Sequence, residues 1–301
     1  MRNLLFLIAV ISLTNCSNSK QQADAFGNFE ADETLVSAEM SGKILWLDVE
    51  EGNVLEKEQA VGSIDTIMPS LQLLEIDAQK QRVWANMKSI ESQIEVLNQQ
   101  KTNLTVDFER ISALIESGAA TQKQLDDISG ALKVIEKQMA ASESQKTALS
   151  KEVQVIDSKS LLLDEQLTKC KIRNPLKGTV LEKYAEPGEI TAAGKPLYKI
   201  ADVENIILRV YVSGGQMHQV IKGQACKVRI DKGKKEFIEY DGTISWISSK
   251  AEFTPKIIQT KEERVSMVYA VKINVKNDGS INIGMPGEVL FSRQSAVNSQ
   301  Q

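Results

Sequence analysis

The spacing of apolar residues changes twice along the chain, from a period of two to a heptad period and back again. Short aliphatic runs around turn glycines occupy residues 38–67 and 172–202, which is typical of small strands joined by hairpins. Between them, over 68–171, apolar residues recur at alternating spacings of three and four, which predicts long helices. Over 203–292 short β-type runs return with turn residues between them, as in a small β-barrel.

The two short β segments resemble one another. A constant offset of 136 residues aligns 41–64 with 177–200 without a gap. The identical pairs are Gly42/Gly178, Leu45/Leu181, Glu50/Glu186, Gly52/Gly188 and Ile64/Ile200, and the conservative pairs are Ile44/Val180, Val54/Ile190 and Val61/Leu197. Such an internal repeat predicts two halves of one compact β-sandwich.

Two heptad series fill the region between the halves. The first consists of Leu73, Ile76, Lys80, Val83, Met87, Ile90, Ile94, Leu97, Lys101, Leu104, Phe108, Ile111 and Ile115. The second consists of Leu125, Ile128, Leu132, Ile135, Met139, Ser142, Lys146, Leu149, Val153, Ile156, Ser160, Leu163, Leu167 and Cys170. Each series is the a/d seam of a coiled coil, and the polar members weaken the seam while favouring one register.

The break between the two series lies at about residues 116–121. Gly118 suits the position after a helix end, and Thr121 with Gln124 fits a capping box. A heptad seam could also join two chains in a parallel dimer. The split repeat favours an antiparallel hairpin instead, because the flanking β halves must meet in one domain. Helices of about 45 residues would project roughly 70 Å.

The first residues form a secretory signal. Arg2 precedes an apolar core over 4–13, and Cys16 follows at once, as in a bacterial lipobox. We therefore expect a signal peptide over 1–15, a lipidated Cys16 and a tether over 16–27; an ordinary signal with an incidental cysteine is the alternative. A barrel strand is expected over 28–37, and a tail over 293–301.

Composition argues against several function classes. With 36 basic and 40 acidic residues the formal charge is −4, so no basic field exists to attract nucleic acid. The only histidine, His218, has no nucleophile motif near it, and no Cys/His metal spacing occurs. We predict no enzyme activity, no catalytic or metal-binding residue and no cofactor. Cys170 and Cys226 could pair, but two separate buried thiols are favoured.

The combination of these features resembles the HlyD type of periplasmic adaptor subunit, or membrane fusion protein, over nearly the whole chain after Cys16. The resemblance implies an α+β fold: a long antiparallel coiled-coil α-hairpin inserted into a split lipoyl-like β-sandwich, followed by a small β-barrel domain. True lipoyl carriers present a modified lysine at the turn between the halves. Here the hairpin replaces that turn, which argues against a carrier.

The resemblance also points to the hairpin tip. TolC-dependent adaptors have an arginine, a leucine four residues later and a serine seven beyond that, and Arg110, Leu114 and Thr121 keep this spacing with threonine in place of serine. These residues are expected to bind the channel. Arg110 offers a planar fork of donors and Leu114 an apolar contact. A solvated charge, an interhelical contact and a simple helix cap are the alternatives.

The remaining expectations follow from the resemblance alone. The partners would be a TolC-like outer-membrane channel and an inner-membrane transporter, with an ABC permease preferred over the RND or MFS classes, because residues 253–269 and 284–287 resemble adaptors of ABC exporters. The chain would form a ring, expected to be a hexamer, in the periplasm, with a lipid anchor in the inner membrane. The alternative function is an envelope coiled-coil scaffold without a transport role.

Overall fold

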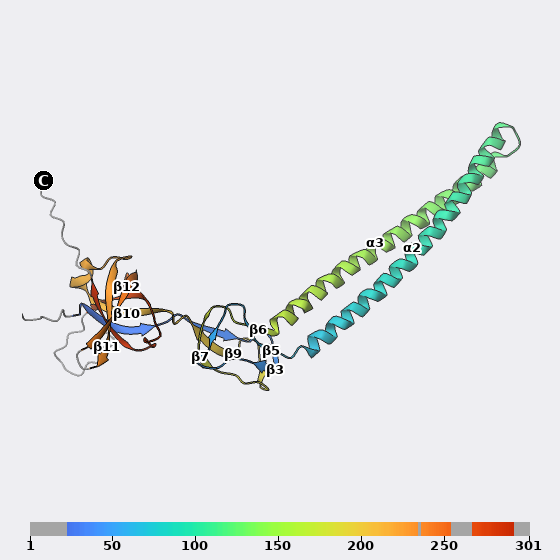
Figure 1. Cartoon of the computed structure of the whole chain (residues 1–301). Coiled ribbons are helices and arrows are strands. Elements are labelled where there is room, and N and C mark those ends of the chain that lie inside the picture. The colour runs from blue at the N-terminus through green and yellow to red at the C-terminus, as the bar shows by residue number, and fades with distance from the viewer. Residues whose placement is uncertain (1–22, 234–235, 254–266, 292–301) are drawn as a thin grey trace, which may run out of the picture.

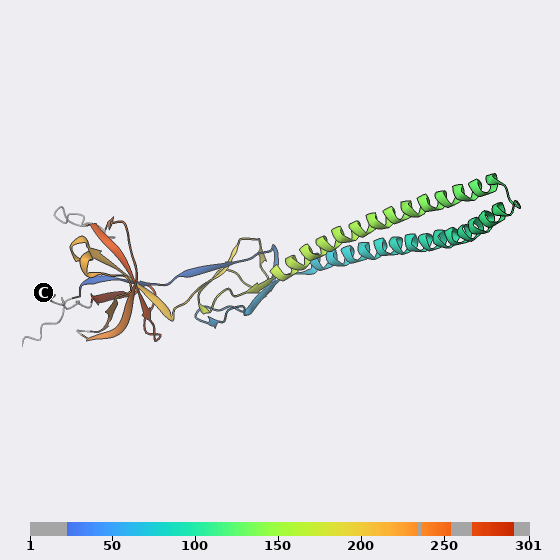
Figure 2. The same ribbon diagram turned by 90° about the horizontal axis from the view of Figure 1, so that it is seen from above.

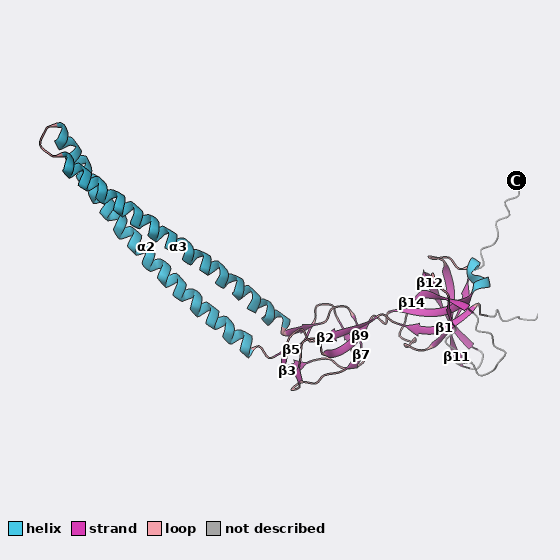
Figure 3. Ribbon diagram, turned by 180° about the vertical axis from the view of Figure 1, so that it is seen from behind, coloured by secondary structure: helices cyan, strands magenta, loops and turns pink. Residues whose placement is uncertain are grey.

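Three parts follow one another in a row in the computed structural model, which describes residues 23–233, 236–253 and 267–291 (Figure 1). A long helical hairpin lies at one end, a small β-sandwich lies in the middle and a β-barrel lies at the other end. The same order is visible from above and from behind (Figures 2 and 3). The predicted fold class is confirmed.

The β-sandwich consists of two four-stranded sheets, ordered β2-β9-β7-β4 and β6-β5-β3-β8. Its strands are β2 (Glu33–Ser37), β3 (Gly42–Leu47), β4 (Val54–Leu55), β5 (Ala60–Ile64), β6 (Lys171–Arg173), β7 (Gly178–Lys183), β8 (Ile190–Thr191) and β9 (Pro196–Ala201). The offset found in the sequence maps β3 onto β7 and β4 onto β8, residue by residue. The sequence repeat is therefore a repeat of strands.

Each sheet takes two strands from each half of the repeat. The exchange is reciprocal: the N–H of Gly52 donates to the Val180 carbonyl at 2.9 Å, and the N–H of Gly188 donates to the Ile44 carbonyl at 2.8 Å. Gly52 and Gly188 both have positive φ, at 88° and 94°, a conformation that glycine adopts without a steric penalty. Neither half can complete its sheets without the other.

The two ends of the helical insert are held together at the sandwich. The N–H of Ile64, at the end of β5, donates to the carbonyl of Cys170 at 2.8 Å, and both residues are buried. Cys170 ends the second helix and is followed directly by β6, which pairs with β5. The hairpin therefore leaves and re-enters the sandwich at one fixed point.

A buried asparagine follows this point in the chain. The Asn174 side chain donates to the carbonyls of Glu56, at 2.9 Å, and Leu176, at 2.5 Å, and accepts from the Tyr198 hydroxyl at 3.2 Å. Asn174 and Tyr198 have no exposed surface, and burial raises the pKa of the Tyr198 hydroxyl. All polar atoms of this side chain are thus satisfied, as burial requires.

The hairpin is formed by α2 (Ile67–Glu116) and α3 (Gln122–Lys169). All positions of both predicted seams are buried or half-buried, with Val83, Leu97, Ser142 and Ile156 the most enclosed within the helices. The remaining faces are mostly exposed. A helix of 50 residues extends about 75 Å, and the hairpin is the longest of the three parts of the molecule (Figure 1).

Three lysines on the seam form ion pairs with the other helix: Lys80 with Asp157 at 2.7 Å, Lys146 with Glu91 at 3.1 Å and Lys101 with Glu136 at 3.0 Å. From one pair to the next, the residue number on α2 increases by the same amount by which the residue number on α3 decreases. All three pairs therefore belong to one antiparallel register whose mirror point lies between Gly118 and Ala119, in the loop.

The ion pair with Lys146 changes the pKa of the Glu91 carboxylate. Its hydrogen bond and charge interaction with Lys146 lower its pKa, with a smaller contribution from Lys88. Because the pKa of Glu91 is lowered in the folded state, its ion pair stabilises the fold at pH values above the pKa that this carboxylate has in the unfolded chain. This stabilisation is lost as the pH falls through the folded pKa. The ion pair between Glu91 and Lys146 therefore contributes at neutral pH and is lost in acid.

The barrel closes on itself through six strands, ordered β10-β1-β15-β11-β12-β14, because β14 also pairs with β10. Its elements are β1 (Ala25–Glu30), β10 (Asn205–Ser213), η1 (Gly214–Gln219), β11 (Ala225–Gly233), β12 (Glu236–Ile247), β13 (Glu252–Phe253), β14 (Met267–Lys276) and β15 (Pro286–Phe291). Phe29, Leu208, Val228 and Ile273 are among the residues of its core. Closure leaves no open edge in this ring.

The structure divides the N-terminal segment differently from our prediction. In place of one barrel strand over 28–37 it has two strands in two domains: β1 pairs with β10 and β15, whereas β2 pairs with β9 of the sandwich. The chain crosses between the domains at residues 31–32. Phe29 packs in the barrel core and Val36 in the sandwich core, so one straight strand could not bury both. The expected tether over 16–27 also overlaps β1, which begins at Ala25.

The ion pairs predict a charge-reversal effect. Lys101→Glu should lower the free energy of unfolding of the hairpin by about 0.5 kcal/mol, because a carboxylate then faces Glu136 at a half-exposed site. Adding Glu136→Lys should restore stability. Thermal melts followed at 222 nm would measure both variants, and an unchanged midpoint in Lys101→Glu would contradict the proposed role in register.

The buried asparagine predicts a larger effect. Asn174→Leu should destabilise the sandwich by about 3 kcal/mol, because two carbonyls and the Tyr198 hydroxyl lose their partner in the interior. The exposed Asn98→Leu serves as the matched control and should change stability by less than about 0.5 kcal/mol. Urea unfolding measures both, and equal effects would refute the role of the network.

Candidate functional site

The distal end of α2 is closed by a Schellman motif. Gly118 has φ of 74°, its N–H donates to the Ile115 carbonyl at 2.9 Å, and the N–H of Ala119 donates to the Leu114 carbonyl at 2.8 Å. The Ser117 hydroxyl also donates to the Leu114 carbonyl, at 2.9 Å. The last carbonyls of the helix are therefore satisfied within the tip itself.

The start of α3 is closed by the predicted capping box. The Thr121 hydroxyl oxygen accepts from the N–H of Gln124 at 3.4 Å, and the Gln124 side-chain oxygen accepts from the N–H of Thr121 at 2.8 Å. The hydroxyl also donates to that oxygen at 3.0 Å. The Thr121 side chain is thus engaged by its own helix, as expected of a cap.

Arg110 and Leu114 lie on the last two turns of α2, four residues apart and so on one side of the helix. The Arg110 side chain is 67% exposed, and its guanidinium contacts Asp107 at 3.3 Å. Leu114 is 38% exposed although it belongs to the helix next to the loop. An exposed ion pair of this kind contributes little to stability, so Arg110 remains available to a partner.

The structure thus places Arg110, Leu114 and Thr121 at the same end of the hairpin. It puts the first two side chains on one exposed side and leaves the third with a defined structural role. Binding of a channel by these three residues remains a prediction. Cys16, the expected lipidation site, lies outside the described residues.

Cys170 and Cys226 are free and buried in different cores, Cys170 in the sandwich and Cys226 in the barrel. Burial raises the pKa of both thiols, that of Cys226 to about 11. Thiols that are protonated and enclosed react slowly. Cys170 and Cys226 do not form a disulfide with each other.

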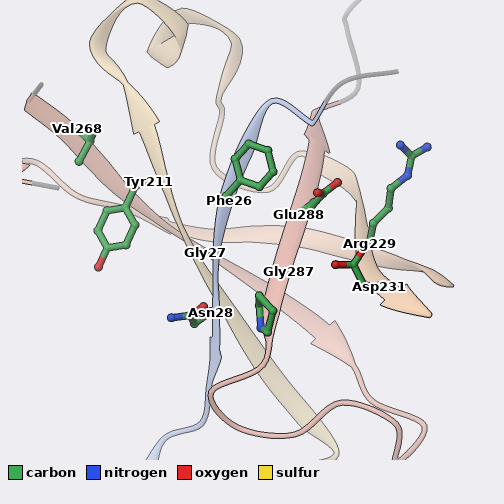
Figure 4. Close-up of a pocket in the computed structure, with 10 residues that line it drawn as sticks. Phe26, Gly27, Asn28, Tyr211, Arg229, Asp231, Val268, Gly287 and Glu288 are labelled. Carbon is green, nitrogen blue, oxygen red and sulfur yellow. The ribbon is translucent and has the colours of Figure 1, made fainter. Parts of the chain in front are cut away.

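A hollow on the outer wall of the barrel was not foreseen from the sequence. Its volume is about 560 Å³, and its lining comes from β14, β10, β1, β15 and β11 (Figure 4). It is lined by Phe26, Gly27, Asn28, Tyr211, Arg229, Asp231, Val268, Pro286, Gly287 and Glu288. The only signal in the sequence was the alternation within β1, which turns Phe26 and Asn28 outward and Phe29 inward. The register aligns Tyr211, Phe26 and Glu288 across adjacent strands.

The one histidine of the sequence, His218, lies within the described ranges. His218 is exposed in η1, and its Nδ1 lies 2.8 Å from the Gly215 carbonyl. No group of three or more His, Cys, Asp or Glu residues in those ranges could hold a metal ion. No helix among the described residues is long and apolar enough to cross a membrane.

Comparison with known proteins places this architecture. No family model matches the chain. A UPF0194 membrane protein from the asrC 5′ region of Acidithiobacillus ferridurans is 25% identical over 289 residues, covering 87% of this chain and 84% of that protein. Among solved structures, MacA from Actinobacillus actinomycetemcomitans has a TM-score of 0.52 and 21% identity, over 88% of this chain and 76% of MacA.

A further solved structure, the periplasmic adaptor protein EmrA, is 14% identical with a TM-score of 0.47, over 89% of this chain and 98% of EmrA. The likeness to MacA establishes the fold. The resemblance to HlyD-type adaptors drawn from the sequence is confirmed at this level.

The capping box predicts the effect of changing Thr121. Thr121→Ala should destabilise the tip by about 1 kcal/mol, because the N–H of Gln124 loses its acceptor, whereas Thr121→Ser should retain most of the stability. Hydrogen exchange of the first turn of α3 measures the difference. Equal protection in the two variants would contradict a capping role for the hydroxyl.

Proposed function

We propose that this chain is a periplasmic adaptor that links an inner-membrane exporter to a TolC-like outer-membrane channel, for efflux or secretion across the Gram-negative envelope. The observation that carries the proposal is the hairpin: a register-locked arm about 75 Å long, fixed at both ends to one point of the sandwich. Such an arm transmits position over a distance and needs no chemistry of its own.

The tip is the end that meets the channel in this proposal. Both helix ends there are closed by their own caps, so the exposed side of Arg110 and Leu114 is presented on a fixed scaffold. Arg110 offers donors to carbonyls or carboxylates of helices in the channel, and Leu114 offers an apolar contact. Thr121 acts mainly by holding the start of α3.

The barrel and the N-terminus form the other end. β1 begins at Ala25, only a few residues after Cys16, so a lipid on Cys16 would hold the barrel close to a membrane surface. This supports an anchor in the inner membrane, next to the transporter, which we propose to be an ABC permease. Several copies, forming a hexameric ring, would surround a conduit above it.

A photoreactive residue at Leu114 tests the proposal in living cells. Capture of an outer-membrane channel is the expected result. Capture of another helical envelope protein, and no channel, would instead support the alternative of a coiled-coil scaffold without a transport role and would overturn the adaptor function.

A charge reversal at the tip gives the quantitative test. Arg110→Asp should reduce channel capture and export at least about tenfold, equivalent to about 1.4 kcal/mol, because it removes the donor fork. Arg82→Asp is the matched control, since Arg82 is an exposed arginine on the same helix far from the tip. Helicity should be unchanged in both variants, and export that survives Arg110→Asp would show that the tip assignment is wrong.

A further inference from the structure

A second heptad pattern runs along the outside of the hairpin, apart from the seam. On α3, apolar residues recur every seven positions, and we call Val134, Ala141, Ala148, Val155 and Leu162 the α3 stripe. On α2 the position facing away from the seam holds Leu71, Ala78, Ala85, Ser92, Gln99, Val106 and Ala113, which we call the α2 stripe. Every residue of both stripes is exposed.

The larger apolar members of both stripes expose about half or more of their surface. Val155 is 55% exposed, Leu162 60%, Leu71 55% and Val106 49%. The α3 stripe spans 28 residues, or about 42 Å of helix. Regular spacing along such a length is what a helix partner requires, since a seven-residue repeat keeps one face turned to a neighbour.

The ion pairs of the hairpin set the relative heights of the two stripes. Asp157 pairs with Lys80, so Val155, two residues earlier, lies level with position 82, midway between Ala78 and Ala85. In the same way, the pair of Glu136 with Lys101 puts Val134 level with position 103, between Gln99 and Val106. The residues of one stripe therefore lie at the heights of the gaps in the other.

A hollow on α3 has the shape that such packing needs. Val134, Lys137, Gln138 and Ala141, together with Lys133, surround it. Positions i, i+3, i+4 and i+7 form the diamond that receives one knob in knobs-into-holes packing. Its centre is level with Gln99 of the α2 stripe.

One hairpin cannot bring its two stripes together, because the α2 stripe faces directly away from α3. Identical copies that stand at the same height can. We propose that the α3 stripe of one copy packs against the α2 stripe of the next copy as a second, intermolecular seam. The two stripes differ, so the contact is heterologous and propagates around a ring. This inference rests on the proposed function and names the surfaces that would join its subunits.

Cysteine crosslinking tests the predicted pairing. The full chain carrying Ala85→Cys and Val155→Cys, treated in cells with a short thiol crosslinker, should give a ladder of dimers and larger species. The two single variants carry the same native cysteines and set the background, and when coexpressed they should give dimers only. A double variant that yields no ladder, although both thiols react with a maleimide, would overturn the proposal.

The height of the pairing has its own control. Ala85→Cys with Val134→Cys uses the same two stripes, but the positions differ in height by 18 residues, or about 27 Å. This variant should give no ladder. Crosslinking as efficient as in the Ala85/Val155 pair, or crosslinks from Val155 to a different protein only, would refute the interleaved seam.

A charge on the stripe should weaken the contact. In the Ala78→Cys/Leu162→Cys background, Val155→Glu should reduce the ladder at least about tenfold, because a carboxylate would be buried in the seam. The neighbouring exposed Gln154→Glu should leave it unchanged. Helicity serves as the fold check. A ladder without channel capture at Leu114 would refute the proposed function alone, and channel capture without a ladder would refute this interface alone.

Discussion

The exchange of strands between the two halves of the sandwich is the constraint on which the rest of the molecule depends. β3 pairs with β8 and β4 pairs with β7, so each half is completed by a segment more than a hundred residues away in the chain. The hydrogen bond from Ile64 to Cys170 closes this long connection at its base. A flexible insert would carry an entropic cost on closure, whereas two helices of nearly equal length return to their starting point by geometry.

The lysines on the seam determine how the two helices align. An uninterrupted apolar seam would tolerate shifts by whole heptads, which differ little in burial. In the observed register all three lysines, Lys80, Lys101 and Lys146, find a carboxylate on the other helix. A shift by one heptad in either direction would place Asn98 or Trp84 opposite Lys146. The individual pairs are half-exposed and contribute modestly to stability. Their common effect is selective, because a register shifted by one heptad would leave at least one of the three lysines without a carboxylate partner.

The register of the two helices also fixes the relative heights of the residues on the outer faces of the hairpin. The positions of the α2 and α3 stripes relative to each other follow from the ion pairs, so the same lysines that align one hairpin would align its neighbours in a ring. The tip is likewise defined by local bonds, with a Schellman motif and a capping box on either side of the loop. A long arm with a defined end and defined flanks fits the proposed role in assembly, in which the shape of the arm sets the distance between its partners.

The sequence by itself determined the repeat, the two helices, the tip and the class of fold, because these depend on local periods and on turn residues such as Gly118 and Thr121. The seam positions were likewise predictable, since a heptad pattern records which face is buried. What the tertiary structure alone decided depends on contacts between distant segments. Which carboxylate each seam lysine contacts depends on the axial register of the two helices. Three further features depend on which strands lie side by side: the crossing at residues 31–32, the partners of Asn174 and the hollow beside Phe26. The alternation along one strand does not say which sheet that strand joins.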